Sequence, residues 1–130
     1  MEFSWICKFN RFRSKVAESV FNKISKNSKI EVISAGVIRG HPLDKKEVAI
    51  AKELGFPISS KSQGLTSKML GESDYHVIVA DDVPKLLLKD SPKYGKKLIV
   101  WKIPDSKKDN EVEIKKIIRK FQDVFWLGNY

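Results

Sequence analysis

The residue types that could do chemistry gather near the start of the chain, where Cys7 is followed six positions later by Arg13 and then directly by Ser14. A cysteine thiolate is a good nucleophile, and an arginine guanidinium presents two parallel donors that match two oxygens of a phosphate-like group. The pattern Cys-x5-Arg is weak by itself, because a chain with 25 Lys and Arg residues produces it readily by chance. The alternative is an inert, buried cysteine at the end of a strand.

The segments on either side of Cys7 favour the chemical interpretation. Residues 2–6 alternate and are rich in aromatic and β-branched side chains, which predicts a strand. Apolar residues recur at helical spacing after the cysteine, which predicts an amphipathic helix from Ser14 to about Lys26. A strand, a short loop and a helix together point backbone N–H groups at an anion, and the helix N-terminus adds about half a positive charge. We therefore expect residues 8–14 to form an anion-binding loop that holds Cys7 as a thiolate.

The rest of the chain predicts alternating strands and helices. Further strands are expected over the residue ranges 29–35, 75–80 and 97–101. Further helices are expected over the ranges 45–54, 67–70, 83–89 and 111–125, the first two after the capping residues Asp44 and Thr66, with Gly55 ending the first. The order β-α-β-α-β-α-β-α is typical of an α/β fold. We expect a single three-layer α/β domain over residues 1–130, with a four-stranded parallel sheet and helices on both faces.

The expected sheet brings two candidate residues to one edge. Ligands of open parallel sheets bind at the carboxyl ends of the strands. Cys7 follows the first strand and Asp105 follows the fourth, so we expect both at the same rim. Asp109 lies four residues further along a lysine-rich loop and is the nearest rival to Asp105.

Composition limits the class of protein. The 130 residues suit one domain, and the net charge of +9 favours anionic partners such as phosphorylated substrates, nucleic acid or a membrane surface. The lysines are spread along the sequence, so solvated helix faces explain the charge at least as well as a nucleic-acid patch. One cysteine excludes an internal disulfide, and His41 and His76 do not make a convincing metal site.

Other sequence features indicate the cellular setting. No apolar run approaches the ~18 residues of a membrane span, and the start has no signal-peptide pattern. Together with the lone cysteine, these features predict a protein of the reducing cytoplasm with no membrane partner. We expect it to be a monomer.

The residues singled out so far lie in motifs that resemble those of the low-molecular-weight protein tyrosine phosphatases and the related arsenate reductases. The family's opening motif Cys-x-Gly-Asn-x-Cys-Arg-Ser corresponds to residues 7–14, and its Ser-Ala-Gly corresponds to residues 34–36. Three further motifs, Gly-x-Pro-x-Asp, Gly-Ile-Pro and Asp-Tyr, correspond to residues 40–44, 55–57 and 74–75. The likeness runs from about Phe3 to Phe125, and the order and spacing of the motifs make it specific.

The resemblance implies a phosphomonoester hydrolase, and more narrowly a protein tyrosine phosphatase, that acts through a phosphocysteine. Cys7 would be the nucleophile, Arg13 would stabilise charge on the phosphoryl oxygens, and Asp105 would be the general acid. The phosphate-binding residues implied are Lys8, Phe9, Asn10, Arg11, Phe12, Arg13 and Ser14, with Asn10, Ser14 and Ser34 in supporting roles. The substrate would be a phosphorylated protein or a small phosphomonoester. Inorganic phosphate or another oxyanion would be the product or an inhibitor, and no metal or cofactor is implied.

The chain departs from the family motifs at several positions. Phe9 stands where the loop glycine is expected, and Phe12 stands where the second loop cysteine is expected. The late acid is followed by Ser106 in place of proline and by Lys107 and Lys108 in place of tyrosines. The acid expected at the end of the third strand falls on Ala80, with Asp81 one place later.

Two alternatives follow from the same residues. An arsenate reductase of the same fold would need an external small thiol, because thioredoxin-coupled relatives use further cysteines of their own chain and this chain has only Cys7. A binding module would keep the loop for phosphate, or for the backbone of a nucleic acid, without turnover. Phe9 and the basic charge motivate that alternative, although nucleic acid is the less favoured partner.

Overall fold

The computed structural model describes residues 2–25, 29–38, 43–59, 61–84, 88, 96–104 and 110–124. The strands of its sheet are β1 (Glu2–Cys7), β2 (Glu31–Gly36), β3 (Tyr75–Val79) and β4 (Lys97–Trp101). They lie in the order β2-β1-β3-β4, so β1 and β3 are interior strands. Every neighbouring pair is parallel, which confirms the predicted four-stranded parallel sheet.

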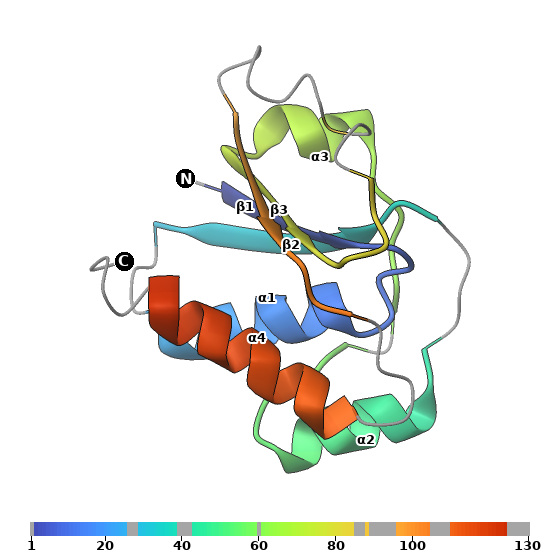
Figure 1. Ribbon diagram of the computed structural model, residues 1–130. Helices are drawn as coiled ribbons and strands as arrows, with labels where there is room; N and C mark the ends of the chain where they lie inside the picture. Colours follow the sequence, from blue (N-terminus) through green and yellow to red (C-terminus); the bar gives the residue numbers. More distant parts are fainter. Residues whose placement is uncertain are drawn as a thin grey trace.

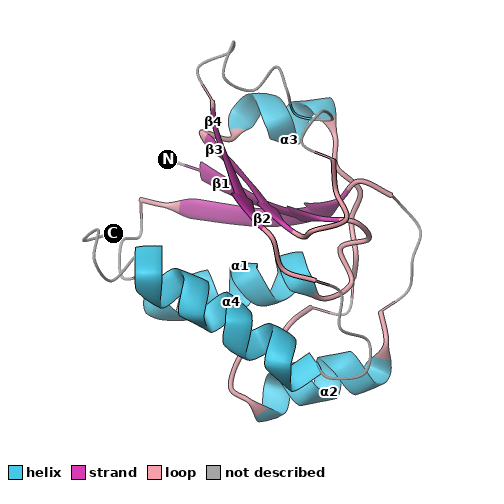
Figure 2. Ribbon diagram, viewed as in Figure 1, coloured by secondary structure: helices cyan, strands magenta, loops and turns pink. Residues whose placement is uncertain are grey.

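Helices cover both faces of this sheet (Figures 1 and 2). The helices on one side are α1 (Arg13–Ile24), α2 (Lys45–Glu53) and α4 (Asn110–Val124), and α3 (Ser67–Glu72) lies on the other. The predicted three-layer arrangement is therefore confirmed. The helix expected over residues 83–89 falls largely outside the described residues.

Local capping explains where two helices begin and where one ends. The Asp44 carboxylate accepts a hydrogen bond from the Lys46 N–H at 2.8 Å, and the Thr66 hydroxyl oxygen accepts one from the Met69 N–H at 3.1 Å. Gly55 follows α2 with a φ of 90°, a conformation that favours glycine. All three residues act as the sequence predicts.

Aromatic side chains fill the core between the sheet and the helices α1 and α4. Trp5 of β1 is fully buried, and its ring centroid lies 5.2 Å from that of Phe121 in α4, 5.4 Å from Trp101 in β4 and 5.8 Å from Phe21 in α1. Trp101 and Phe121 meet edge to face, at 5.0 Å and 83°, which the ring quadrupoles favour. This cluster holds β1 in a fixed position relative to the helix that follows it.

Polar contacts of buried residues attach α3 to the opposite face of the sheet. The hydroxyls of Ser4 in β1 and Ser73 after α3 are hydrogen-bonded to each other. His76 of β3 lies with Nε2 2.9 Å from the Leu70 carbonyl oxygen, so Nε2 carries the proton and donates it. Burial lowers the pKa of His76, because the imidazolium would lose its hydration there. The folded protein therefore favours a neutral His76.

A His76→Gln variant tests this assignment through the pH dependence of stability. Because the folded-state pKa lies below the ordinary value of 6.5, the unfolded chain binds a proton first as the pH falls, and stability is lost below that value. We expect the free energy of unfolding to fall more steeply in the wild type than in the variant, by at most about 1.4 kcal/mol per pH unit. Urea unfolding at about pH 7.5 and about pH 5.5 measures the difference. The carboxyl groups contribute to both proteins alike, so equal slopes would show that His76 is not held neutral.

Candidate active site

The loop between β1 and α1 lies at the carboxyl end of an interior strand. Its distinctive residue is Asn10, which is fully buried and has a left-handed φ of 53°. Asparagine tolerates this conformation better than most residues. The Asn10 side-chain oxygen accepts a hydrogen bond from the Gln63 N–H at 2.8 Å, and its amide nitrogen donates one to the Ser14 hydroxyl oxygen at 2.7 Å. Asn10 thus ties the turn of the loop to α1 and to the segment before α3.

The same network orients a hydroxyl toward the cysteine. Cys7 is 2% exposed, and its Sγ lies 3.0 Å from the Ser14 Oγ. Since Ser14 Oγ accepts the hydrogen bond from Asn10, its own O–H is left to donate to the sulfur. Ser14, which the sequence analysis proposed as a supporting residue, therefore lies where its hydroxyl can donate to the Cys7 sulfur.

The N-terminus of α1 follows the loop and has no side-chain cap. Its N-cap is Phe12, which makes no side-chain capping hydrogen bond, and the first turn contains no acidic residue. The free N–H groups and the helix dipole can therefore act on a bound oxyanion. The Phe12 side chain itself turns into the core beneath the loop, where it is 4% exposed. It fills space in the aromatic core.

Arg13 is held at the rim by groups from two other strands. Nη1 donates to the Ile103 carbonyl oxygen at 2.9 Å, just after β4. Nη2 lies 3.0 Å from one carboxylate oxygen of Asp82 and 3.1 Å from the other, and Nη1 lies 3.7 Å from Asp81. The guanidinium has five N–H donors, so donors remain for an oxyanion. The sequence analysis found Ala80 where an acid was expected, with Asp81 one place later, and missed Asp82, although both aspartates follow β3 at the expected rim.

The backbone of the loop packs directly against Gly36, the last residue of β2. A Cβ at this position would lie 2.5 Å from the Asn10 nitrogen and 2.5 Å from the Phe9 carbonyl carbon. The Gly36 N–H donates to the Gln63 carbonyl oxygen at 2.9 Å, and the Gln63 side-chain amide donates to the Ser34 carbonyl oxygen at 2.7 Å. Gln63 therefore links β2 to the loop, and sequence reasoning missed it because nothing in the spacing of its neighbours indicates this contact.

Ser34 supports the site through its main chain and through α1. Its carbonyl oxygen binds Gln63, and its hydroxyl is hydrogen-bonded to the Glu18 carboxyl. Burial raises the pKa of Glu18, against the smaller effects of Lys15 and the Ser34 hydroxyl, which lower it. Ser34 thus contacts Gln63, which in turn binds Asn10 of the loop.

The other loop side chains lie around its outer edge. The Lys8 ammonium is 5.2 Å from the centre of the Phe9 ring. Arg11 reaches Glu47 of α2 with a nitrogen–oxygen distance of 3.4 Å. The Ile38 N–H donates to the Lys8 carbonyl oxygen at 2.9 Å, which continues the pairing of β1 and β2 into the start of the loop. These contacts connect the loop to both neighbouring segments of the chain.

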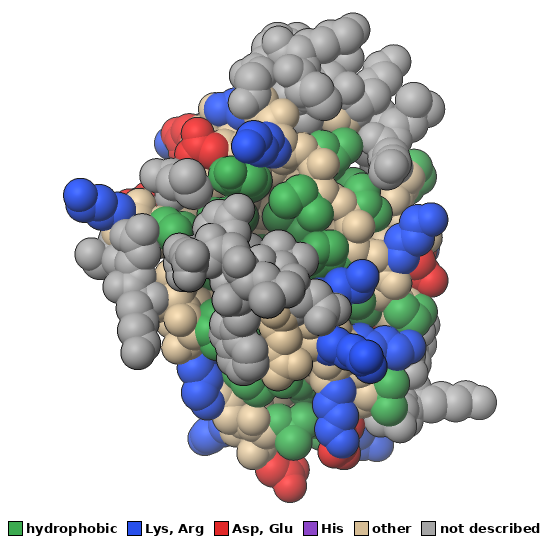
Figure 3. All heavy atoms as spheres, turned by 60° about the vertical axis from the view of Figure 1, so that its left-hand side comes forward, with side chains coloured by type: hydrophobic (Ala, Val, Ile, Leu, Met, Phe, Trp, Pro, Cys, Tyr) green, Lys and Arg blue, Asp and Glu red, His purple; other side chains and the backbone are tan. Residues whose placement is uncertain are grey.

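Asp105 and Asp109 lie outside the described residues, as do Ser106, Lys107 and Lys108. In the described part of the chain, no three His, Cys, Asp or Glu side chains are grouped to hold a metal ion. No helix there is long and apolar enough to cross a membrane. The described Lys and Arg side chains lie at several separate places on the face shown in Figure 3. The described residues of that face do not form one continuous basic surface.

Comparison with known proteins identifies the family. A model of the low molecular weight phosphotyrosine protein phosphatase family matches residues 2–124. The chain belongs to this family. No curated protein sequence matches it.

Solved structures with the same fold include both phosphatases and arsenate reductases. A low molecular weight protein tyrosine phosphatase from Streptococcus pyogenes has a TM-score of 0.80 and 22% identity, over 97% of this chain and 90% of that one. An arsenate reductase from Archaeoglobus fulgidus has a TM-score of 0.71 and 19% identity, over 93% and 96%. A thioredoxin-dependent arsenate reductase from Corynebacterium glutamicum has a TM-score of 0.74 and 22% identity, over 97% of this chain and 60% of that one. These similarities confirm the fold and do not separate the two activities.

A Gly36→Ala variant tests the close contact between Gly36 and the backbone of the loop. The added methyl would clash with backbone atoms of Phe9 and Asn10, so the loop must move away from its position. We expect phosphate affinity, measured by calorimetry, to fall about 10-fold or more, and stability to fall by roughly 1–3 kcal/mol.

Gly71→Ala in α3 is the matched control, because a Cβ at that position meets nothing within 4 Å. It should keep phosphate affinity and gain about 0.5–1 kcal/mol of stability from better helix propensity. Full phosphate affinity in Gly36→Ala would contradict the close approach of the loop.

Proposed function

We propose that this protein hydrolyses phosphomonoesters, and more narrowly phosphotyrosine in proteins, through a phosphocysteine formed at Cys7. The observation that carries the proposal is the Ser14 hydroxyl 3.0 Å from Cys7 Sγ, inside a loop that leads into the uncapped N-terminus of α1. Membership of the low molecular weight phosphotyrosine protein phosphatase family supports it.

The reaction proceeds in two displacements at phosphorus. The Cys7 thiolate attacks, an S–P bond forms, and the bond between phosphorus and the ester oxygen breaks. Arg13 and the N–H groups of the loop stabilise the charge on the three other oxygens. Water then attacks the phosphocysteine, the S–P bond breaks, and inorganic phosphate and the thiolate are released. No step needs a metal ion.

Asp105 is the proposed acid that protonates the departing ester oxygen and then activates the water. The Ile103 carbonyl oxygen contacts Arg13, and two residues of chain span at most about 7 Å. Ile103, two residues before Asp105 in the sequence, is therefore in contact with the Arg13 guanidinium. Asp109 lies four residues further along the sequence and is the weaker candidate.

The proposed partners follow from the charge and from the lone cysteine. The net charge of +9 suits phosphorylated proteins or small phosphomonoesters as substrates, and phosphate or another oxyanion as inhibitor. The reducing cytoplasm would keep Cys7 in its reduced form. We propose that the enzyme is a monomer.

Arsenate reduction is the second candidate, favoured by the arsenate reductases among the structural neighbours. Cys7 would attack arsenic in the same loop and displace hydroxide. An external small thiol would then attack the Cys7 sulfur, so that the S–As bond breaks, arsenite leaves and a mixed disulfide forms, which a second small thiol would reduce to restore Cys7. This chain has no further cysteine to form a disulfide with Cys7. Turnover of arsenate that depends on an added small thiol, without ester hydrolysis, would favour this candidate.

The nucleophile is tested by alkylation and turnover. We expect iodoacetate to alkylate Cys7 near neutral pH and phosphate to slow that reaction, because both anions occupy the loop. Hydrolysis of p-nitrophenyl phosphate should be lost in Cys7→Ser, be blocked by vanadate and survive excess EDTA. A Cys7 that phosphate does not protect, or an activity that EDTA removes and a divalent ion restores, would contradict the mechanism.

The acid is tested with leaving groups of different quality. Protonation matters most for a poor leaving group. Asp105→Asn should therefore lose roughly 10²-fold on phenyl phosphate and less on p-nitrophenyl phosphate, with phosphate binding nearly unchanged. Asp109→Asn is the matched control and should keep full activity. The reverse result would make Asp109 the acid, and wild-type protein without turnover of any ester would favour a binding module.

A further inference from the structure

The three cationic side chains of the loop differ in what balances their charge. Arg13 lies 3.0 Å from a carboxylate oxygen of Asp82, and Arg11 lies 3.4 Å from one of Glu47. Among the residues that the structure describes, no carboxylate forms an ion pair with Lys8. Lys8 therefore presents a positive charge at the loop that the described protein groups leave for a ligand.

The Lys8 ammonium is held in place beside an aromatic ring. It lies 5.2 Å from the centre of the Phe9 ring, within the ~6 Å over which a cation and a ring attract each other. Lys8 and Phe9 are both half-buried. The Lys8 carbonyl oxygen accepts a hydrogen bond from the Ile38 N–H at 2.9 Å, and the Phe9 backbone packs against Gly36. An ammonium held in this way loses less side-chain entropy when it meets an anion than a mobile surface lysine does.

Lys8 lies next to the proposed nucleophile at an open edge of the loop. It follows Cys7 directly in the sequence, and consecutive Cα atoms are about 3.8 Å apart. Ile38, the backbone partner of Lys8, is 43% exposed. A substrate whose phosphate occupies the loop therefore brings its neighbouring groups close to this charge.

We propose that Lys8 determines specificity at this site and selects phosphorylated protein segments that carry a carboxylate beside the phosphorylated residue. This inference rests on the proposed function, which places the phosphoryl group at Cys7 and Arg13. Arg13 contacts the phosphoryl oxygens, which are the same in every ester, so it does not separate one substrate from another. The Lys8 charge attracts a carboxylate near the phosphate and leaves a neutral side chain unaffected, which favours acidic substrates in both encounter and binding.

The test compares two phosphotyrosine peptides that differ only at the two positions flanking the phosphotyrosine, which are Glu in one peptide and Gln in the other. At low salt the wild type should hydrolyse the Glu peptide with a kcat/KM about 3- to 5-fold higher, as expected of one exposed charge pair. This preference should shrink at about 0.15 M salt, because salt screens exposed charges. The ratio compares two substrates on one protein, so a general loss of activity in a variant does not change it.

Substitutions at Lys8 then assign the preference. Lys8→Met and Lys8→Gln each remove the charge and should reduce the preference to about 1.5-fold or less. Lys8→Arg keeps the charge and should keep the preference. Having two neutral replacements means that the failure of one to fold does not leave the question open. A wild-type preference in a folded neutral variant would overturn the proposal.

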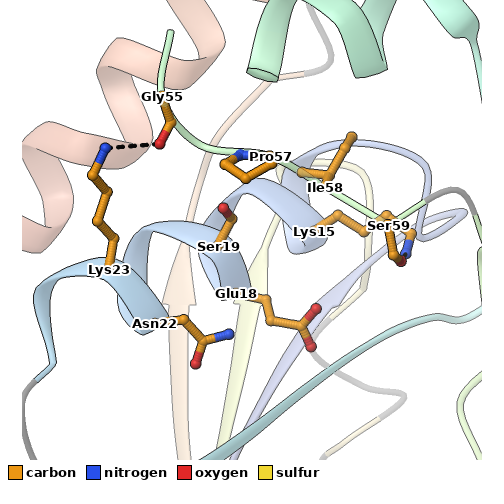
Figure 4. A pocket seen from close by; sticks show the side chains of 9 residues that line it. All are labelled: Lys15, Glu18, Ser19, Asn22, Lys23, Gly55, Pro57, Ile58 and Ser59. Carbon is orange, nitrogen blue, oxygen red and sulfur yellow. Dashed lines mark hydrogen bonds between the residues drawn. The ribbon is translucent and has the colours of Figure 1, made fainter. Parts of the chain in front are cut away.

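Lys23 provides the matched control. Its ammonium lies 4.9 Å from the centre of the Phe56 ring, so it has the same kind of aromatic contact as Lys8. It donates to the Gly55 carbonyl oxygen at 2.8 Å and lines a pocket between α1 and residues 55–59, which Cys7 and Lys8 do not line (Figure 4). Lys23 lies in the last turn of α1, about 15 Å along the helix from its first residue. Lys23→Met should therefore keep the wild-type preference, and a loss equal to that in Lys8→Met would overturn the proposal, because the effect would then reflect net charge.

A second pair of peptides separates this inference from the proposed function. It contains the nonhydrolysable phosphonomethylphenylalanine in place of phosphotyrosine, and calorimetry measures its binding. If the wild type hydrolyses both phosphotyrosine peptides equally well at low salt, only the inference is wrong. If it hydrolyses neither but binds the Glu phosphonate more tightly in a manner that depends on Lys8, the proposed function is wrong and selection by Lys8 stands. If it neither hydrolyses nor binds these peptides, both are wrong.

Discussion

The backbone of the loop after β1 lies directly on Gly36, and the rest of the site depends on that contact. Gly36 is the last residue of β2 and pairs with Cys7 across the sheet. Because it has no side chain, the main chain of Phe9 and Asn10 can come within reach of the sheet. The left-handed turn at Asn10 then directs its side chain to both Gln63 and Ser14. The Cys7 thiol, the Ser14 hydroxyl and the N-terminus of α1 come together because Gly36 has no Cβ.

The sequence predicts those parts of the structure whose cause is local. Strand β4, the caps at Asp44 and Thr66, and the helix end at Gly55 depend on residues within a few positions of one another, and the structure has them where they were expected. Periodicity and capping chemistry are sufficient for such features. Cys7 and Ser14 are only seven positions apart, but their contact also depends on the distant Gly36 and Gln63, which act through Asn10.

The missed features all join segments that are distant in the sequence. Gln63 lies 53 residues from Asn10, and Asp82 lies 69 residues from Arg13, so no spacing rule connects either pair. The carbonyl oxygen of Ile103, 90 residues from Arg13, carries no signal in its residue type. Phe12 was noted as a missing cysteine and as one of the phosphate-binding loop residues, and its burial in the aromatic core became clear only when the packing of α1 was known. Topology predicts which rim these groups share, but their partners depend on the packed structure.

The contacts of Arg13 make the site a property of the completed fold. One guanidinium bonds to a residue after β3 and to another after β4, while its own loop lies on the end of β2. During folding, a chain that has paired only β1 with β2 would contain the cysteine loop but would lack the groups that hold Arg13. An oxyanion that needs the whole arrangement would bind the native state alone, and such a ligand stabilises the native state in proportion to the logarithm of its concentration. Phosphate in solution would then shift the folding equilibrium toward molecules in which all four strands are in place.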